Sequence, residues 1–136
     1  MREITIPEDI QLVDPVTDKP VRKADEHGRP IDEPDEPLTF RKWVILRPLR
    51  DPKFAKNSEG QGDVEALYYA ADLRKALKDA RPGDRITIEE TVWKRLDECV
   101  RKPSQPYDAG FMYQLIPFID AITKAEKKES AKKEEN

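Results

Sequence analysis

The chain has 136 residues, the size of one ordinary domain, and carries 25 basic and 28 acidic side chains for a net charge of −3. The two signs are mixed along the chain and no basic stripe interleaved with aromatic residues is present, so we expect no dominant role in neutralising nucleic-acid phosphates. The charged opening MREITIPEDI is unlike a signal peptide, no run approaches the roughly 18 apolar residues of a membrane span, and one cysteine, Cys99, cannot form an internal disulfide. We therefore expect a soluble intracellular protein.

Residues 1–37 are predicted to form a β-leaning, proline-rich flexible arm. The runs EITIP and IQLVD favour strands, and DPVTDKP between them is typical of a turn. Two interpretations stay open, a short hairpin that pairs residues 10–13 with 20–23, and a loose arm. Residues 14–37 hold few large apolar side chains, so they cannot bury enough surface to offset the entropy of ordering them.

Residues 38–123 are predicted to form a helical domain. In its first helix Thr39 is a natural N-cap, Phe40, Trp43 and Val44 have helical spacing, and Pro48 ends the segment. The second helix has the most regular pattern. It is predicted to begin with Asp63 as its N-cap and to stop at RPGD, with an inward face of Ala66, Tyr69, Ala70, Leu73, Leu77 and Ala80. Tyr68 and Tyr69 cannot both lie on that face.

A third helix is predicted after the RPGD turn. Thr87 and Glu90 have the spacing of a capping box, and Glu90 and Lys94 have that of an i,i+4 ion pair, with Ile86 in a short bridge beforehand. The chain then breaks at Pro103 and Pro106. The apolar face of this helix comprises Val92, Trp93, Leu96, Cys99 and Val100.

The last helical segment begins after Asp108, a natural N-cap, and contains Pro117 in its interior. Proline there costs about 3 kcal/mol in a straight helix, so the segment either kinks or starts a new helix with Pro117 in its first turn. We favour the kink. The apolar face is wider than one helix seam requires, so part of it is predicted to bind a partner. The candidate partner-binding residues are Phe111, Met112, Leu115, Phe118, Ile119 and Ile122.

Residues 124–136 carry five lysines and four glutamates without a large apolar side chain, and we expect a disordered tail. The predicted fold class is therefore mainly α (α+β). We expect a compact bundle of about four helices with a short N-terminal β-hairpin or arm and this disordered charged C-terminal tail.

The sequence offers no combination of residues that is typical of catalysis. His27, the only histidine, falls in the proline-rich arm, and the acidic run at 32–36 lacks the spacing of a calcium loop. Cys99 lies on an apolar helix face, which favours an inert thiol, and Gly60 and Gly62 lack the lysine of a P-loop. We therefore expect no enzyme, and no catalytic, cofactor or metal site.

The order of the segments resembles that of small proteins from the structural modules of tailed bacteriophages, several of them described as tail-assembly chaperones. The resemblance covers about residues 3–126. It depends on the landmarks Thr39-Phe40, Asp51-Pro52, Pro82-Gly83-Asp84, Trp93 and Pro117-Phe118.

This resemblance implies a non-enzymatic helper that acts in the host cytoplasm, where it binds the tape-measure protein and keeps it soluble before the tail tube polymerises. It implies a protein partner rather than nucleic acid or a membrane, and it leaves homo-oligomers open. Two alternatives are a small virion connector or tail-completion subunit, and a phage regulator or inhibitor that binds a host protein.

Overall fold

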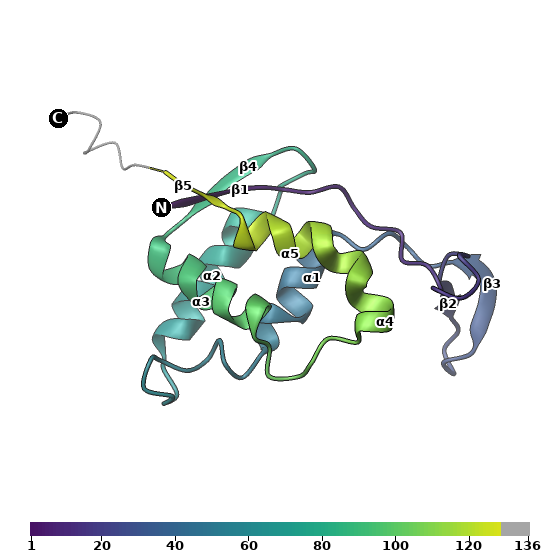
Figure 1. Ribbon diagram of the computed structural model, residues 1–136, viewed down its shortest axis with the longest axis horizontal. Helices are drawn as coiled ribbons and strands as arrows, with labels where there is room; N and C mark the ends of the chain where they lie inside the picture. Colours follow the sequence, from purple (N-terminus) through teal and green to yellow (C-terminus); the bar gives the residue numbers. More distant parts are fainter. Residues whose placement is uncertain (129–136) are drawn as a thin grey trace.

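The computed structural model describes residues 1–128 and combines helices with a small antiparallel sheet, a mixed α+β fold (Figure 1). The helical segments are α1 (Phe40–Leu46), η1 (Pro48–Arg50), α2 (Glu65–Leu77), α3 (Glu90–Arg101), α4 (Ala109–Met112), η2 (Tyr113–Leu115) and α5 (Ile116–Thr123), where η denotes a 3-10 helix. The strands are β1 (Arg2–Thr5), β2 (Arg22–Ala24), β3 (Pro30–Pro34), β4 (Arg85–Ile88) and β5 (Glu126–Lys127).

Strand β1 lies at the centre of a three-stranded antiparallel sheet in the order β4-β1-β5. Ile4 pairs with Ile86 on one side, and Glu3 pairs with Glu126 on the other. The prediction of a disordered tail from residue 124 is therefore wrong for its first residues, because Ala125 is buried and β5 bonds to β1. The rest of the predicted tail, residues 129–136, lies outside the described residues.

Arg2 fixes the start of β1 to α3 and to the segment that follows α5. Its guanidinium lies 3.8 Å from the Trp93 ring centroid, donates to Glu90 (Nε to Oε2, 3.0 Å) and donates to the carbonyl oxygen of Ala125 (3.0 Å). Glu90, predicted to pair with Lys94, is thus bonded to Arg2 instead. This hydrogen bond, more than the charge of Arg2, lowers the pKa of Glu90 below its usual value.

The core lies under the sheet, where α1, α3 and α5 meet. Phe118 is fully buried, and its ring centroid lies 5.6 Å from that of Phe40 and 5.7 Å from that of Trp43. The indole nitrogen of Trp93 donates to the carbonyl of Ile122 at 2.9 Å, which ties α3 to α5. These contacts, at centroid distances usual for aromatic pairs, join segments that are far apart in sequence.

Most predicted helix faces are confirmed. Thr39 caps α1 by accepting a hydrogen bond from the Lys42 amide, and all five residues predicted for the face of α3 are buried. On α2, the predicted inward residues are buried or partly buried, and Tyr68 is exposed instead of Tyr69. Helix α2 begins at Glu65, slightly later than predicted, and Asp63 accepts a hydrogen bond from the Glu65 amide.

The prediction of a capping box at Thr87 is wrong. Thr87 belongs to β4, where it pairs with Glu3, while Ile88 on the same strand is buried. Residues 85–88 alternate in burial as a strand does, because β1 offers them a hydrogen-bonding partner that local spacing cannot reveal. Helix α3 therefore starts at Glu90, after Glu89 in an extended conformation.

The kink favoured at Pro117 is also wrong. The chain passes from α4 through η2 into a new helix, α5, and Pro117 lies in its first turn. A first-turn residue has no intrahelical acceptor for its amide, so proline loses no hydrogen bond there. Asp108 caps α4 as predicted, since its side chain accepts from the Gly110 amide.

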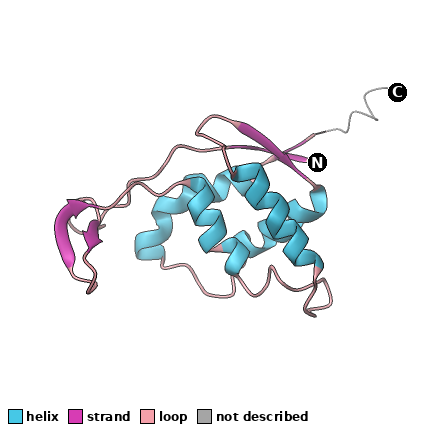
Figure 2. Cartoon of the chain, turned by 180° about the vertical axis from the view of Figure 1, so that it is seen from behind, coloured by secondary structure: helices cyan, strands magenta, loops and turns pink. Residues whose placement is uncertain are grey.

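The N-terminal arm contains two hairpin elements. Val13 bridges to Pro20, and the Val21 amide donates to Leu12, so the predicted hairpin is present in a short form, while Ile10 pairs with Leu38. Beyond it, β2 and β3 form a second hairpin that stands away from the helices (Figure 2). Its residues are mostly exposed, in keeping with a segment that has no core of its own.

We predict that Phe118→Ala lowers the free energy of unfolding by about 3–5 kcal/mol, the usual cost of deleting a fully buried phenylalanine. Chemical denaturation followed by circular dichroism measures it. The matched control is Ile116→Ala on the same helix, where the side chain is 53% exposed and the change should be about 0.5 kcal/mol or less. Equal losses in the two variants would contradict the assignment of Phe118 to the core.

We predict that the effect of Glu90→Gln depends on pH. Since the folded-state pKa of Glu90 lies below the ordinary 4.5, its stabilisation is complete above that pH and is lost as the pH falls through the lower folded value. The difference in unfolding free energy between the native protein and the variant should therefore be largest at neutral pH and shrink in acid. Glu89→Gln, a change at an exposed neighbour, should show no such trend.

Candidate functional site

An apolar pocket of about 250 Å³ opens between α1–η1, the loop 102–107 and α4–η2. Each wall comes from a different part of the chain, and the aromatic core of α1 and α5 lies behind it. The lining residues are mainly apolar: Trp43, Leu46, Pro48, Pro52, Cys99, Pro103, Pro106, Tyr107, Met112 and Leu115, with Arg47, Arg50, Asp51, Ser104 and Gln105 among them. We call this cavity the apolar pocket.

Trp43, a lining residue of the apolar pocket, has a buried hydrogen-bond donor. Its indole nitrogen has no acceptor among the described residues, whereas that of Trp93 is bonded. A buried donor without a partner costs free energy.

The loop 102–107 is fastened to η1 by Asp51. The carboxylate accepts from both the amide and the hydroxyl of Ser104, and Lys53 donates to the carbonyl of Lys102 at 2.6 Å. Burial acts to raise the pKa of Asp51, but the hydrogen bonds from Ser104 outweigh it and the pKa is lowered. Asp51 therefore stays ionised and occupied, which suits a structural fastening better than acid–base chemistry.

Cys99 and Tyr107 also line the apolar pocket, and both are weak acids. Burial raises the pKa of the Cys99 thiol to about 12. Burial also raises the pKa of Tyr107, whose hydroxyl donates to the Val100 carbonyl at 2.9 Å. Neither group is ionised near neutral pH, so Cys99 is a poor nucleophile, in agreement with its position on an apolar helix face.

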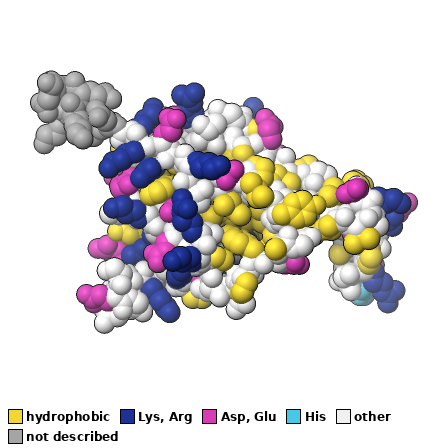
Figure 3. Space-filling model, in the orientation of Figure 1, with side chains coloured by type: hydrophobic (Ala, Val, Ile, Leu, Met, Phe, Trp, Pro, Cys, Tyr) yellow, Lys and Arg dark blue, Asp and Glu magenta, His cyan; other side chains and the backbone are white. Residues whose placement is uncertain are grey.

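Apolar side chains continue from the pocket onto the surface. Tyr113 is 49% exposed, Ile116 53% and Leu46 38%, and the first two adjoin the pocket residues Met112 and Leu115 in the chain. Figure 3 shows hydrophobic side chains gathered over α4, η2 and α5, between the charged helices and the arm. We call the apolar pocket together with Tyr113 and Ile116 the apolar surface.

The structure divides the six predicted partner-binding residues into two groups. Leu115, Phe118 and Ile122 are buried and belong to the core, and only Leu115 also lines the pocket. Phe111, Met112 and Ile119 are partly buried. The outer positions Tyr113 and Ile116 were missed because they lie outside the inward face to which the candidate residues belong.

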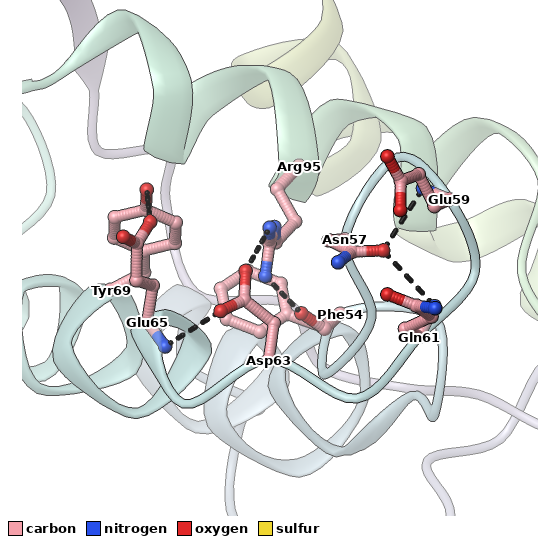
Figure 4. Close-up of polar contacts among 8 residues, drawn as sticks. All are labelled: Phe54, Asn57, Glu59, Gln61, Asp63, Glu65, Tyr69 and Arg95. Atoms are coloured by element: carbon pink, nitrogen blue, oxygen red, sulfur yellow. Dashed lines mark hydrogen bonds and ion pairs between the residues drawn. The ribbon is translucent and has the colours of Figure 1, made fainter.

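A second polar cluster braces the loop that precedes α2 (Figure 4). Arg95 donates to the Phe54 carbonyl and to Asp63, both at 3.1 Å, while Tyr69 donates to Glu65 at 3.0 Å. The hydrogen bonds from Glu65 and Arg95 lower the pKa of Asp63, and the bond to Glu65 raises the pKa of Tyr69. These groups are paired with one another, which indicates a structural role.

Residues 1–128 contain neither a cluster of side chains that could bind a metal ion nor a helix that could span a membrane. No three histidine, cysteine, aspartate or glutamate side chains of this part gather where they could hold a metal ion. His27 lies exposed on the arm, 3.4 Å from Glu26. Within the same residues, the helices are too short or too polar to cross a bilayer.

We compared the chain with protein-family models, curated proteins and solved structures and found no match in any of the three.

We predict that Cys99 reacts slowly with a thiol reagent in the folded protein at pH 8 and rapidly in denaturant, because burial keeps the thiol protonated and covered. Absorbance of a released chromophore measures both rates. Rapid reaction in the folded state, at a rate insensitive to denaturant, would contradict the burial of Cys99. It would also indicate that the apolar pocket opens widely in solution.

Proposed function

We propose that the protein is a non-enzymatic assembly factor that binds an apolar helical segment of a client protein on its apolar surface. The observation that carries this proposal is the continuity between the apolar pocket and the exposed Tyr113 and Ile116. Apolar clefts that continue into exposed apolar side chains are typical of sites that bind protein partners.

A helical client suits the size and shape of this surface. A pocket of about 250 Å³ holds one large apolar side chain. Helices present such anchors at i, i+3 or i+4, and i+7, so that a second anchor from the same helix would contact Tyr113 or Ile116 outside the pocket. Burying one leucine or phenylalanine contributes about 1.5–3 kcal/mol, which makes the anchors the main source of affinity.

The edge of the apolar pocket favours a client with acidic residues beside its anchors. Arg47 and Arg50 line the pocket and are exposed, whereas the nearby carboxylate of Asp51 is already bonded to Ser104. The charge available to a client at this edge is therefore positive. Complementary charge chiefly speeds association and aids selection between partners.

The resemblance to tail-assembly chaperones supplies a specific client, the tape-measure protein, a long helical protein that must stay soluble before the tail tube forms. Binding in the host cytoplasm would cover its apolar stripes until they are needed. This client is part of the proposal and depends on the sequence landmarks.

We predict that replacing Tyr113→Ser and Ile116→Ser together weakens binding of the tape-measure protein about tenfold or more, since two exposed anchors are lost. The free energy of unfolding should change little, because both side chains are about half exposed. Co-purification and calorimetry measure the binding. The matched control is Val16→Ser on the arm, where an apolar side chain is 91% exposed and outside the apolar surface.

Two results would contradict the proposal. The first is that the native protein neither binds the tape-measure protein nor increases its solubility on co-expression. The second is that the double variant binds as well as the native protein. Mass spectrometry of purified particles separates the alternatives, since a chaperone should be absent from them and a connector subunit present in a few copies.

A further inference from the structure

Among the described residues, the most exposed large apolar side chain belongs to the arm. Val16 is 91% exposed and lies in the turn 14–19 of the first arm hairpin. Asp14 and Asp18 lie on either side of it, and both are exposed. Neither carboxylate has an ion-pair partner within residues 1–128. We call residues 14–19 the arm turn.

Hydrogen bonds fix the shape of the arm turn. The Asp18 amide donates to the Asp14 carbonyl, and the Asp14 carboxylate accepts from the Val16 amide, both at 2.8 Å. At the base of the turn, Gln114 of η2 accepts from the Val13 amide at 2.8 Å and donates to the Val13 carbonyl at 2.9 Å. Val16 is therefore presented on a backbone that is already ordered, and it loses little conformational entropy on binding.

The segment that supplies one wall of the apolar pocket is strongly basic. Residues 41–56, which include α1 and η1, carry six basic side chains and one acidic one, Asp51, for a net charge of +5. In the described part of the chain none of the six basic side chains has an ion-pair partner, and Asp51 is bonded to Ser104. Two of the six, Arg47 and Arg50, line the pocket.

The arm has the opposite charge. Its residues 8–36 carry ten acidic and four basic side chains, for a net charge of −6. Opposite charges on two surfaces speed their encounter and select this pairing over a contact between like surfaces. A single exposed valine is normal on a protein surface, but here it accompanies acidic side chains that match a basic pocket edge.

The arm turn does not fill the apolar pocket of its own copy. No arm residue lines that pocket, and Gln114 holds the base of the turn while Val16 faces solvent. Figure 1 shows the arm extending away from the helices, at the end of the molecule opposite β1 and β5. The arm turn is therefore open to another molecule of the same protein.

We propose that the arm turn of one copy inserts Val16 into the apolar pocket of a second copy. The pocket of about 250 Å³ is large enough for this side chain, and Asp14 and Asp18 then meet Arg47 and Arg50 at the pocket edge. The contact joins two different surfaces, so it closes by reciprocal exchange between two copies or extends to further copies. Because it is smaller than a standard stable interface, the assembly exchanges with the monomer and dissociates on dilution.

The self-association uses the apolar pocket but does not require the client. Its test needs only this protein, so a failure of client binding leaves it standing, and the reverse also holds. A client bound in the pocket displaces the arm turn, and Val16→Ser therefore does not weaken client binding.

We predict that the full chain at low ionic strength forms a concentration-dependent species larger than the 15.8 kDa monomer, and that Val16→Ser weakens this association about tenfold or more. Sedimentation velocity over a dilution series measures it. Val16→Leu, which keeps an apolar anchor, should still associate. The matched control is Leu67→Ser on α2, where the side chain is 70% exposed and the change should have no effect. A native protein that stays monomeric at its highest soluble concentration, or a Val16→Ser protein that associates like the native one, would overturn the proposal.

Exchanging the charges tests whether the contact joins two copies. One protein carries Thr17→Lys and Asp18→Asn, which changes the charge of the arm turn from −1 to +1 and keeps a residue that tolerates the positive φ of position 18. The other carries Arg47→Glu and Arg50→Glu. Each should associate less than the native protein, because like charges meet. An equal mixture should recover the association, because each arm turn then finds a pocket edge of opposite charge. A mixture that associates no better than its two components would overturn the proposal.

Discussion

The pairing of β1 with both β4 and β5 is the constraint on which the rest of the fold depends. Residues 2–5 bond to residues 85–88 on one side and to residues 126–127 on the other, so one short strand joins the beginning, middle and end of the described chain. Ile4 extends from this strand into the core, and Arg2 binds Glu90 and the Ala125 carbonyl. Because loop closure over such separations costs entropy, the helices must supply enough burial to offset it.

This constraint explains which elements could be predicted from the sequence. Helices α1, α2 and α3 can be predicted from the local spacing of their apolar residues and from cap residues such as Thr39. The same spacing predicts which of their side chains are buried. Strands β4 and β5 depend on a distant partner, so Thr87 was interpreted as a cap and Glu126 as part of a tail. No local sequence pattern shows that β1 lies beside these two strands and pairs with them.

The candidate site was predictable in location but only partly in its residues. An apolar excess near the C-terminus is evident from the sequence, but Phe118 and Ile122 are needed by the core, while the outward positions are Tyr113 and Ile116. The helical periodicity separates inward from outward positions, but it cannot show which inward side chains the rest of the fold covers. The contribution of Trp43 from α1 requires tertiary contacts that spacing alone does not contain.

Helix α5 is held at both ends, and this favours its use as a binding element. Its first turn follows η2, where Gln114 is bonded to Val13 of the arm, and near its end the Ile122 carbonyl accepts from Trp93. A surface fixed in this way loses little conformational entropy on binding. The β2–β3 hairpin, by contrast, has few buried side chains and would have to be ordered against a partner. A client with only two or three apolar anchors has little binding free energy to offset a loss of conformational entropy. It therefore binds more tightly to the apolar surface, which is already ordered, than to the arm.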